Sequence, residues 1–137
     1  NNLQNDALTF GADKTDIWFH VKGFPGSHAV LFTGGAEPTD LDYTESAMLA
    51  AYHSKASGGV NVQVDYTPVR FVKKPAGAKP GYVIYDKYFT AVVRAELPDG
   101  VREEKKYRFW RGAVCERLRP LPCPVGGKCR MVFNRRF

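Results

Sequence analysis

Residues 16–32 read DIWFHVKGFPGSHAVLF, and this stretch decides the predicted fold. Over its first half, apolar side chains at every second position alternate with Trp18, His20 and Lys22. A period of two is typical of a strand with one buried face, because successive side chains of a strand point to opposite sides. A second strand-like run follows at 28–33, so the stretch predicts two neighbouring strands.

A Pro-Gly turn joins these two runs. Pro25 presets φ for a turn, and Gly26 supplies the positive φ that a type II turn needs. We therefore expect a hairpin with a five-residue loop. Such a hairpin brings four side chains close together: Trp18, His20, Lys22 and His28.

One helix and several further strands are expected around the hairpin. The helix is indicated by SAMLAAYHSKA at 46–56, with Asp42 and Glu45 in capping-box positions before it and Ser57-Gly58-Gly59 after it. Strands are expected at 7–10, 16–22, 28–33, 61–65, 68–72, 82–86 and 89–95. The pattern predicts an α+β fold: a single domain with a mixed or antiparallel β-sheet and one main α-helix packed on it.

Length and charge suggest how the chain is divided. With 137 residues and 44% apolar content, it can bury one modest core. Residues 1–100 carry 9 Lys and Arg against 11 Asp and Glu, a net charge of −2, whereas residues 101–137 carry 11 against 3, a net charge of +8. We therefore expect a domain at 1–95 and a basic C-terminal extension at 96–137.

No apolar run approaches the roughly 20 residues of a membrane helix, and the start NNLQND lacks the features of a signal peptide. These features predict a cytoplasmic protein with no membrane partner. The chain does not begin with Met, which suggests a domain taken from something longer.

The three cysteines, Cys115, Cys123 and Cys129, all lie in the basic extension. An odd number confined to one segment favours a reducing compartment over a secreted disulfide framework. Their spacing lacks the close ligand pairs of a zinc ribbon. We expect no metal and no cofactor, and a Cys123–Cys129 disulfide stays open for oxidising conditions.

Six cations stand between residues 70 and 94 with Asp86 as the only acid: Arg70, Lys73, Lys74, Lys79, Lys87 and Arg94. Three of them lie in KKPAGAKPG at 73–81, where a proline after Lys74 and after Lys79 favours an extended backbone. A local excess of cations suits a polyphosphate partner, because neutralised phosphates release their counterions. The alternative is a solvated face that aids solubility.

An enzyme is a weaker interpretation of the hairpin. Ser27 and His28, with Asp16 or Asp65 as the orienting acid, are residue types of a nucleophilic triad. However, adjacent strand residues point to opposite faces, so Ser27 and His28 would not meet. His20 and His28 with Asp16 are residue types of a metal site, although such histidines more often donate hydrogen bonds. The sequence contains no G-x-S-x-G elbow, Walker A loop, H-E-x-x-H or paired zinc-ligand motif, and we expect a non-catalytic binding domain.

Four blocks within residues 1–95 occur in one order: NNLQNDALTF, DIWFHVKGFPGSH, SAMLAAYHSKA and VDYTPVRFVKKPAGAKPGYVIY. In this order they resemble the NFACT-R domain, the RNA-binding domain of RqcH- and NEMF-type ribosome quality-control factors, a family also described as fibronectin-binding proteins. The resemblance implies an α+β domain that contacts RNA on obstructed large ribosomal subunits. Bacterial members recruit alanyl-tRNA and add a C-terminal alanine tail to the stalled chain. The family's other domains do not match this chain, so tailing is not assigned to it alone.

The resemblance implies tRNA, the large ribosomal subunit and other domains of a parent protein as partners. The matching signature positions are Asp16, Trp18, His20, Lys22, Pro25, Gly26, Ser27 and His28, then Lys73, Lys74, Pro75, Lys79, Pro80 and Gly81.

From their chemistry we expect nine of these positions to form an RNA site. Phosphates are expected to contact Lys22, Lys73, Lys74 and Lys79, and hydrogen bonds to RNA are expected from His20 and His28. Gly26 and Ser27 would offer backbone N–H groups as an anion nest. Trp18 either stacks on a base or packs inside the domain.

Two other functions stay open. One is a stand-alone NFACT-R module that serves an RNA-modification enzyme, and the other is an adhesin that binds fibronectin. The lack of a signal peptide and of structural disulfides argues against the adhesin.

Overall fold

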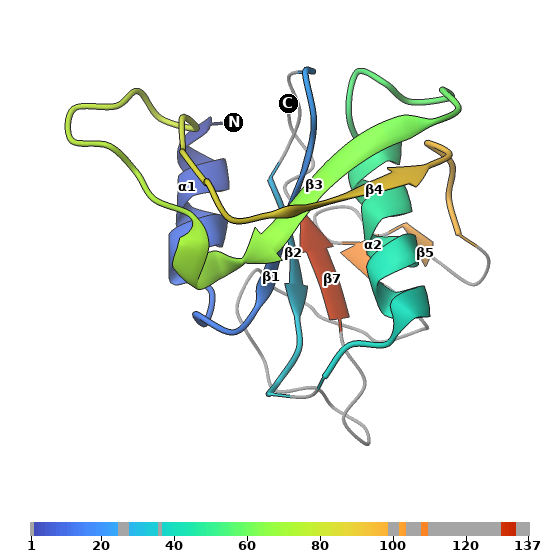
Figure 1. The fold of residues 1–137 in the computed structure, drawn as a ribbon, viewed down its shortest axis with the longest axis horizontal. Helices are drawn as coiled ribbons and strands as arrows, with labels where there is room; N and C mark the ends of the chain where they lie inside the picture. Colours follow the sequence, from blue (N-terminus) through green and yellow to red (C-terminus); the bar gives the residue numbers. More distant parts are fainter. Residues whose placement is uncertain are drawn as a thin grey trace.

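The computed structural model describes residues 2–24, 28–35, 37–98, 102–103, 108–109 and 130–133 (Figure 1). Its helices are α1 (Asn2–Gly11), α2 (Asp40–Tyr52) and the short 3-10 helix η1 (Val69–Phe71). Its strands are β1 (Ile17–Val21), β2 (Ala29–Phe32), β3 (Val62–Pro68), β4 (Phe89–Val93), β5 (Arg102–Glu103), β6 (Arg108–Phe109) and β7 (Arg130–Phe133). The main sheet has the order β4-β3-β1-β2-β7, and all of its pairs are antiparallel. The predicted α+β class is confirmed.

The predicted hairpin is formed by β1 and β2. Trp18 pairs with Val30 and Phe19 with Ala29, so the two strands run antiparallel around the loop that contains the Pro-Gly pair. On its other side β1 pairs with β3 along its whole length. Because β1 is a central strand, it is buried on both faces, and the expectation of one buried and one open face was too simple.

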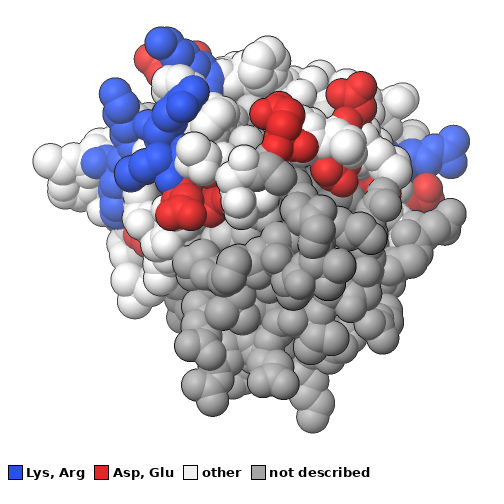
Figure 2. All heavy atoms as spheres, turned by 90° about the horizontal axis from the view of Figure 1, so that it is seen from below, with Lys and Arg blue, Asp and Glu red and all other residues white. Residues whose placement is uncertain are grey.

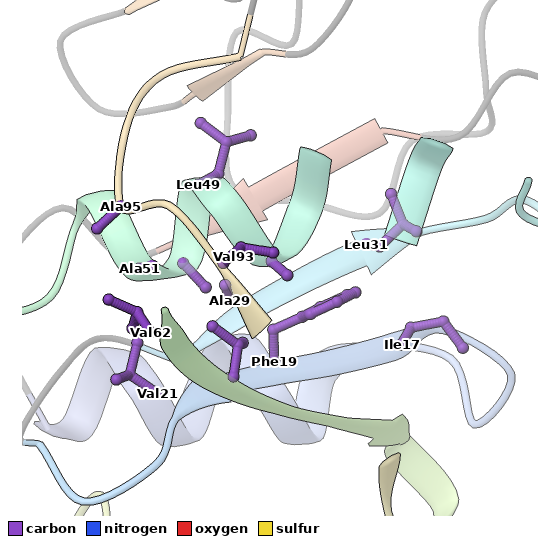
Figure 3. Packing of buried hydrophobic residues seen from close by; sticks show 13 residues of the cluster. Ile17, Phe19, Val21, Ala29, Leu31, Leu49, Ala51, Val62, Val93 and Ala95 are labelled. Carbon is purple, nitrogen blue, oxygen red and sulfur yellow. The ribbon is translucent and has the colours of Figure 1, made fainter. Parts of the chain in front are cut away.

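Two helices cover the two faces of this sheet, where the sequence indicated one. On the first face, alternate β1 side chains at 17, 19 and 21 pack under α2, whose small residues Ala47, Ala50 and Ala51 allow a close approach (Figure 3). On the second face, Trp18 and Val30 pack with Leu8 of α1. Val69 of η1 and Val72, which follows η1, belong to the same cluster. The sheet therefore lies between α1 and α2, and burial of its two apolar faces is the main force that holds the layers together.

Helix α2 begins earlier than its sequence pattern indicated. The Thr39 hydroxyl accepts the N–H of Asp42 at 3.1 Å, and the Asp42 carboxylate accepts the N–H of Thr39 at 2.8 Å. This reciprocal pair is the capping box, three residues before the predicted pair of Asp42 and Glu45. The helix ends at Tyr52, so residues 53–56 of the predicted helix lie beyond it.

Three predicted strands are wrong. Residues 7–10 belong to α1, and residues 68–72 contain the end of β3 followed by η1. Residues 82–86 form no strand; they are joined to the chain before them by a single bridge in which Lys73 and Ile84 exchange backbone hydrogen bonds of 2.9 and 2.8 Å. Aromatic and β-branched residues explain these errors, because they also suit the packed turns that surround a sheet.

The segment expected as an extension contributes strands of its own. Strand β7 pairs with β2, with Ala29 opposite Phe133, and β5 pairs with β6 in a separate ribbon. The domain boundary at residue 95 stays a prediction, and the three cysteines lie outside the described residues. Neither of the two described α-helices combines the length and the apolar character that a membrane span requires.

Candidate functional site

A pocket of about 310 Å³ lies between the β1–β2 hairpin and the segment 81–85. It is lined by Trp18, His20, Val21, Lys22, Gly23, Phe24, His28, Gly81, Tyr82, Val83 and Tyr85. The hairpin and the segment after KKPAGAKPG are the two distinctive blocks of the sequence, and their residues face each other across this pocket. It is the natural candidate for a binding site.

Aromatic and imidazole rings form one wall of the pocket. The ring of Trp18 stacks on that of His20 with 5.7 Å between centroids. It meets the ring of His28 edge to face at 5.3 Å and the tilted ring of Tyr85 at 4.8 Å, again between centroids. The expected proximity of the hairpin side chains is thus confirmed. Trp18 is only 1% exposed, so most of its ring packs inside the domain, and its role in RNA binding stays a prediction.

Helix α1 fixes the position of His28. The Asn5 side chain accepts the backbone N–H of His28 at 3.2 Å, and a hydrogen bond of 2.8 Å joins Thr9 Oγ1 to His28 Nδ1. Burial, with the neighbouring His20 as a further cause, lowers the pKa of His28 to about 4. At neutral pH the His28 ring is therefore an uncharged part of the pocket wall.

Asp65 of β3 contacts three side chains at the side of the pocket where Lys22 lies. Its carboxylate accepts hydrogen bonds of 2.8 Å from the hydroxyls of Tyr85 and Thr90, and it lies 3.4 Å from Lys22 Nζ. Burial and the bond to Asp65 raise the pKa of Tyr85, so its hydroxyl stays protonated. Lys22 also lies over the ring of Tyr88, 5.0 Å from its centroid. The ammonium of Lys22 remains partly exposed beside a buried carboxylate.

The basic loop at 73–81 is tied to α1 by one of its own lysines. Lys74 Nζ lies 3.0 Å from the Asp6 carboxylate and donates to the carbonyls of Lys79 and Tyr82. The other oxygen of Asp6 accepts the backbone N–H of Gly81 at 3.1 Å. Lys74 therefore holds the loop in place, and its charge is balanced.

Lys73 and Lys79 are placed differently from Lys74. Both are exposed, and neither forms an ion pair with any described residue. Both charges are available to a partner from outside.

Further cations gather near η1. Arg70 and Lys87 both lie over the ring of Phe71, at 4.8 and 5.4 Å from its centroid. Viewed from below, Lys and Arg side chains collect toward the side of the molecule on which Figure 1 places α1 (Figure 2). Arg70 and Lys87 thus form a pair of cations around one ring at η1.

The other predicted site residues divide into those outside the described residues and those placed elsewhere. Gly26 and Ser27 lie outside the described residues, so the anion nest and the triad serine stay untested. Asp16 accepts hydrogen bonds from the N–H groups of Asp13 and Thr33, and burial raises its pKa. In the described part of the chain, no three His, Cys, Asp or Glu side chains come together as metal ligands do.

Sequence reasoning missed three residues that support the site, Asn5, Asp6 and Thr9, and it considered Asp65 only as the orienting acid of a triad. The first three belong to the segment taken partly for a strand, and Asp65 is an isolated acid in a strand. A carboxylate that is buried in a strand needs polar partners, so the isolated Asp65 in a strand-like segment could have indicated a supporting role.

The fold and the pocket define a small α+β domain with a ring-lined cavity between a hairpin and a basic loop. The chain is 45% identical over 106 residues to the Rqc2 homolog RqcH of Bacillus subtilis. This match covers 77% of the chain and 18% of that protein. It is also 51% identical over 86 residues to the Rqc2 homolog RqcH of Streptococcus suis. This match covers 62% of the chain and 15% of that protein.

A solved structure is also similar, the C-terminal part of the fibronectin/fibrinogen-binding protein of Streptococcus suis. It has 47% sequence identity and a TM-score of 0.66, over 70% of this chain and 39% of that one. No family model matches the chain. The similarities support a family of the RqcH and fibronectin-binding-protein type. The chain spans less than a fifth of the length of the curated relatives it matches.

Proposed function

We propose that this chain is an RNA-binding module of a ribosome quality-control factor of the RqcH type. The observation that carries the proposal is the pocket in which both distinctive blocks meet, with the exposed cations Lys73 and Lys79 on the loop that ends at it. The resemblance to NFACT-R domains and the identity of 45% to an RqcH protein support the same role.

In this proposal the partners are tRNA, the large ribosomal subunit and further domains of a parent protein in the cytoplasm. Exposed lysines contact phosphates, and the pocket contacts a feature of the RNA beside them. The chain binds without catalysis, and any alanine tailing belongs to the parent protein as a whole.

Binding of labelled tRNA and of purified large subunits tests this function. We expect the double variant Lys73→Ala/Lys79→Ala to bind tRNA roughly tenfold more weakly, because two phosphate contacts are lost. The matched control is Lys55→Ala, an exposed lysine just after α2. Unchanged binding by the double variant would rule out the loop as a phosphate site, and absence of RNA binding by the wild type would refute the function.

The name of the similar solved structure supports a second candidate, a domain that binds fibronectin or fibrinogen. A direct assay of the purified chain on immobilised fibronectin separates the two functions. Saturable fibronectin binding together with no affinity for tRNA would favour the adhesin.

A further inference from the structure

We propose that the pocket between the β1–β2 hairpin and residues 81–85 takes a single unstacked nucleobase of RNA. The domain then selects unpaired nucleotides and does not bind phosphates alone. This inference rests on the proposed function and adds the class of ligand that the pocket accepts.

The pocket has the size and walls that a flat ring requires. Its volume of about 310 Å³ is near the lower limit for small-ligand sites. The rings of Trp18, His20, His28 and Tyr85 line its interior. Unpaired bases of RNA are commonly bound in this way, splayed from their neighbours and placed against protein rings.

Two aromatic side chains of the pocket remain open to solvent. Phe24 is 49% exposed and Tyr82 is 58% exposed, and they come from the two segments that enclose the pocket. A large exposed aromatic ring is unremarkable by itself. Two on one pocket offer a stacking surface to any base, because every base has a π-face.

The Trp18 ring in the pocket wall carries a buried hydrogen-bond donor. Trp18 Nε1 is buried and has no partner among the described residues. An unsatisfied buried donor is unfavourable, so a base acceptor that reaches it by a small shift of the wall would gain a hydrogen bond. Base edges carry carbonyl and ring-nitrogen acceptors, whereas an aliphatic side chain of a protein partner carries none.

The charges of the pocket suit a base that is attached to a phosphate backbone. Two carboxylates of the described residues lie near the pocket, and both are engaged by the protein. Asp65 is 2% exposed and is bound by Tyr85, Thr90 and Lys22. Asp6 is bound by Lys74 and by the backbone N–H of Gly81. No free carboxylate among the lining residues repels a phosphodiester. The partly exposed ammonium of Lys22 lies in the lining, where it can meet the phosphate next to the base.

The test compares three RNA ligands on the whole chain: a single strand of mixed sequence, the same strand with abasic nucleotides at its central positions, and its duplex. We expect Phe24→Ala and Tyr82→Ala each to weaken binding of the single strand roughly 5- to 100-fold. We expect little effect on the abasic strand and the duplex, and Tyr82→Phe should bind as the wild type does because stacking is kept. Phe89→Ala is the matched control, since Phe89 is 67% exposed on β4 and does not line the pocket.

Each outcome decides between the two proposals. If Lys73→Ala/Lys79→Ala weakens binding but both aromatic variants bind the single strand normally, RNA binding stands and the base pocket is refuted. Equal losses on all three ligands would also refute it, because the variants would then act through phosphates or through folding. If Tyr82→Ala removes fibronectin binding and leaves RNA binding intact, the pocket serves a protein. Wild-type chain that binds no RNA would refute the function itself.

Discussion

His28 shows how one buried side chain can link the site to the fold. It is 2% exposed, its backbone N–H donates to Asn5, and its ring is hydrogen-bonded to Thr9. A protonated imidazole would bring a charge into this apolar wall beside His20. The neutral form is therefore required for the wall to keep its shape.

This requirement predicts a loss of stability in mild acid. The pKa of His28 is about 4 in the folded chain against an ordinary value of 6.5, so the unfolded chain binds the proton more readily. The free energy of unfolding should fall as pH drops from about 6.5 to about 4, by up to about 3 kcal/mol. Urea denaturation at a series of pH values measures this fall in the free energy of unfolding.

The variant His28→Asn provides the control for this prediction. It should be less stable at neutral pH, because the packing around the ring is lost, and its stability should depend less on pH between 4 and 6.5. Identical pH profiles for the variant and the wild type would contradict the assignment. NMR titration that places the pKa of His28 near 6.5 would do the same.

At the scale of residues, the sequence predicted the hairpin neighbours but not their roles. Trp18, His20 and Lys22 share a face because strands alternate, and that follows from local spacing. The balanced charge of Lys74 depends on Asp6, which is 68 positions away and on a different element. Contacts of this kind follow from tertiary structure, so a count of lysines could not separate Lys74 from Lys73.

At the scale of elements, α1 acts as the support of the basic loop. Asp6 holds both Lys74 and the backbone N–H of Gly81, and Gly81 lines the pocket. The loop has few other anchors: the bridge between Lys73 and Ile84 lies at its base. The position of the pocket wall therefore depends on a helix near the start of the sequence, 75 positions before Gly81.

We predict that Asp6→Ala loosens this loop without unfolding the domain. The amide of Gly81 should exchange with solvent roughly tenfold faster, because its acceptor is gone and Lys74 loses its partner. Hydrogen exchange followed by NMR measures this rate. Asp13→Ala is the control, since the Asp13 side chain is exposed. Unchanged protection of Gly81 in Asp6→Ala would show that α1 does not hold the loop.

The sequence predicted some of the helices and strands and missed others. The hairpin and β4 were predicted because turn residues and alternation act locally. Helix α1 was missed because its buried face carries Asn5 and Thr9 while Leu3 on its outer face is 67% exposed. Apolar periodicity thus did not mark its inner side. Its polar inner residues are there to hold His28, a requirement that only the assembled structure reveals.

For the whole molecule, the distribution of charge matters more than the net value of +6. The region up to residue 100 has a net charge of −2, yet Lys and Arg side chains gather on the side where α1 lies (Figure 2). Several acids are already engaged within the domain, among them Asp6 and Asp65. The engagement of these acids leaves the cations Lys73 and Lys79, which form no ion pair with a described residue, to act on a partner.

The salt dependence of RNA binding can separate the free charges from the balanced ones. The slope of log affinity against log salt falls by about 0.7 to 0.9 for each lost phosphate contact. Lys73→Gln/Lys79→Gln should therefore lower the slope by about 1.4 to 1.8. Asp6→Asn/Lys74→Gln removes one charge of each sign and keeps the net charge of the wild type, so its slope should match that of the wild type even if the affinity drops. A slope that falls by about 0.7 to 0.9 in Asp6→Asn/Lys74→Gln would mean that Lys74 also contacts phosphate, and that its ion pair with Asp6 opens when RNA binds.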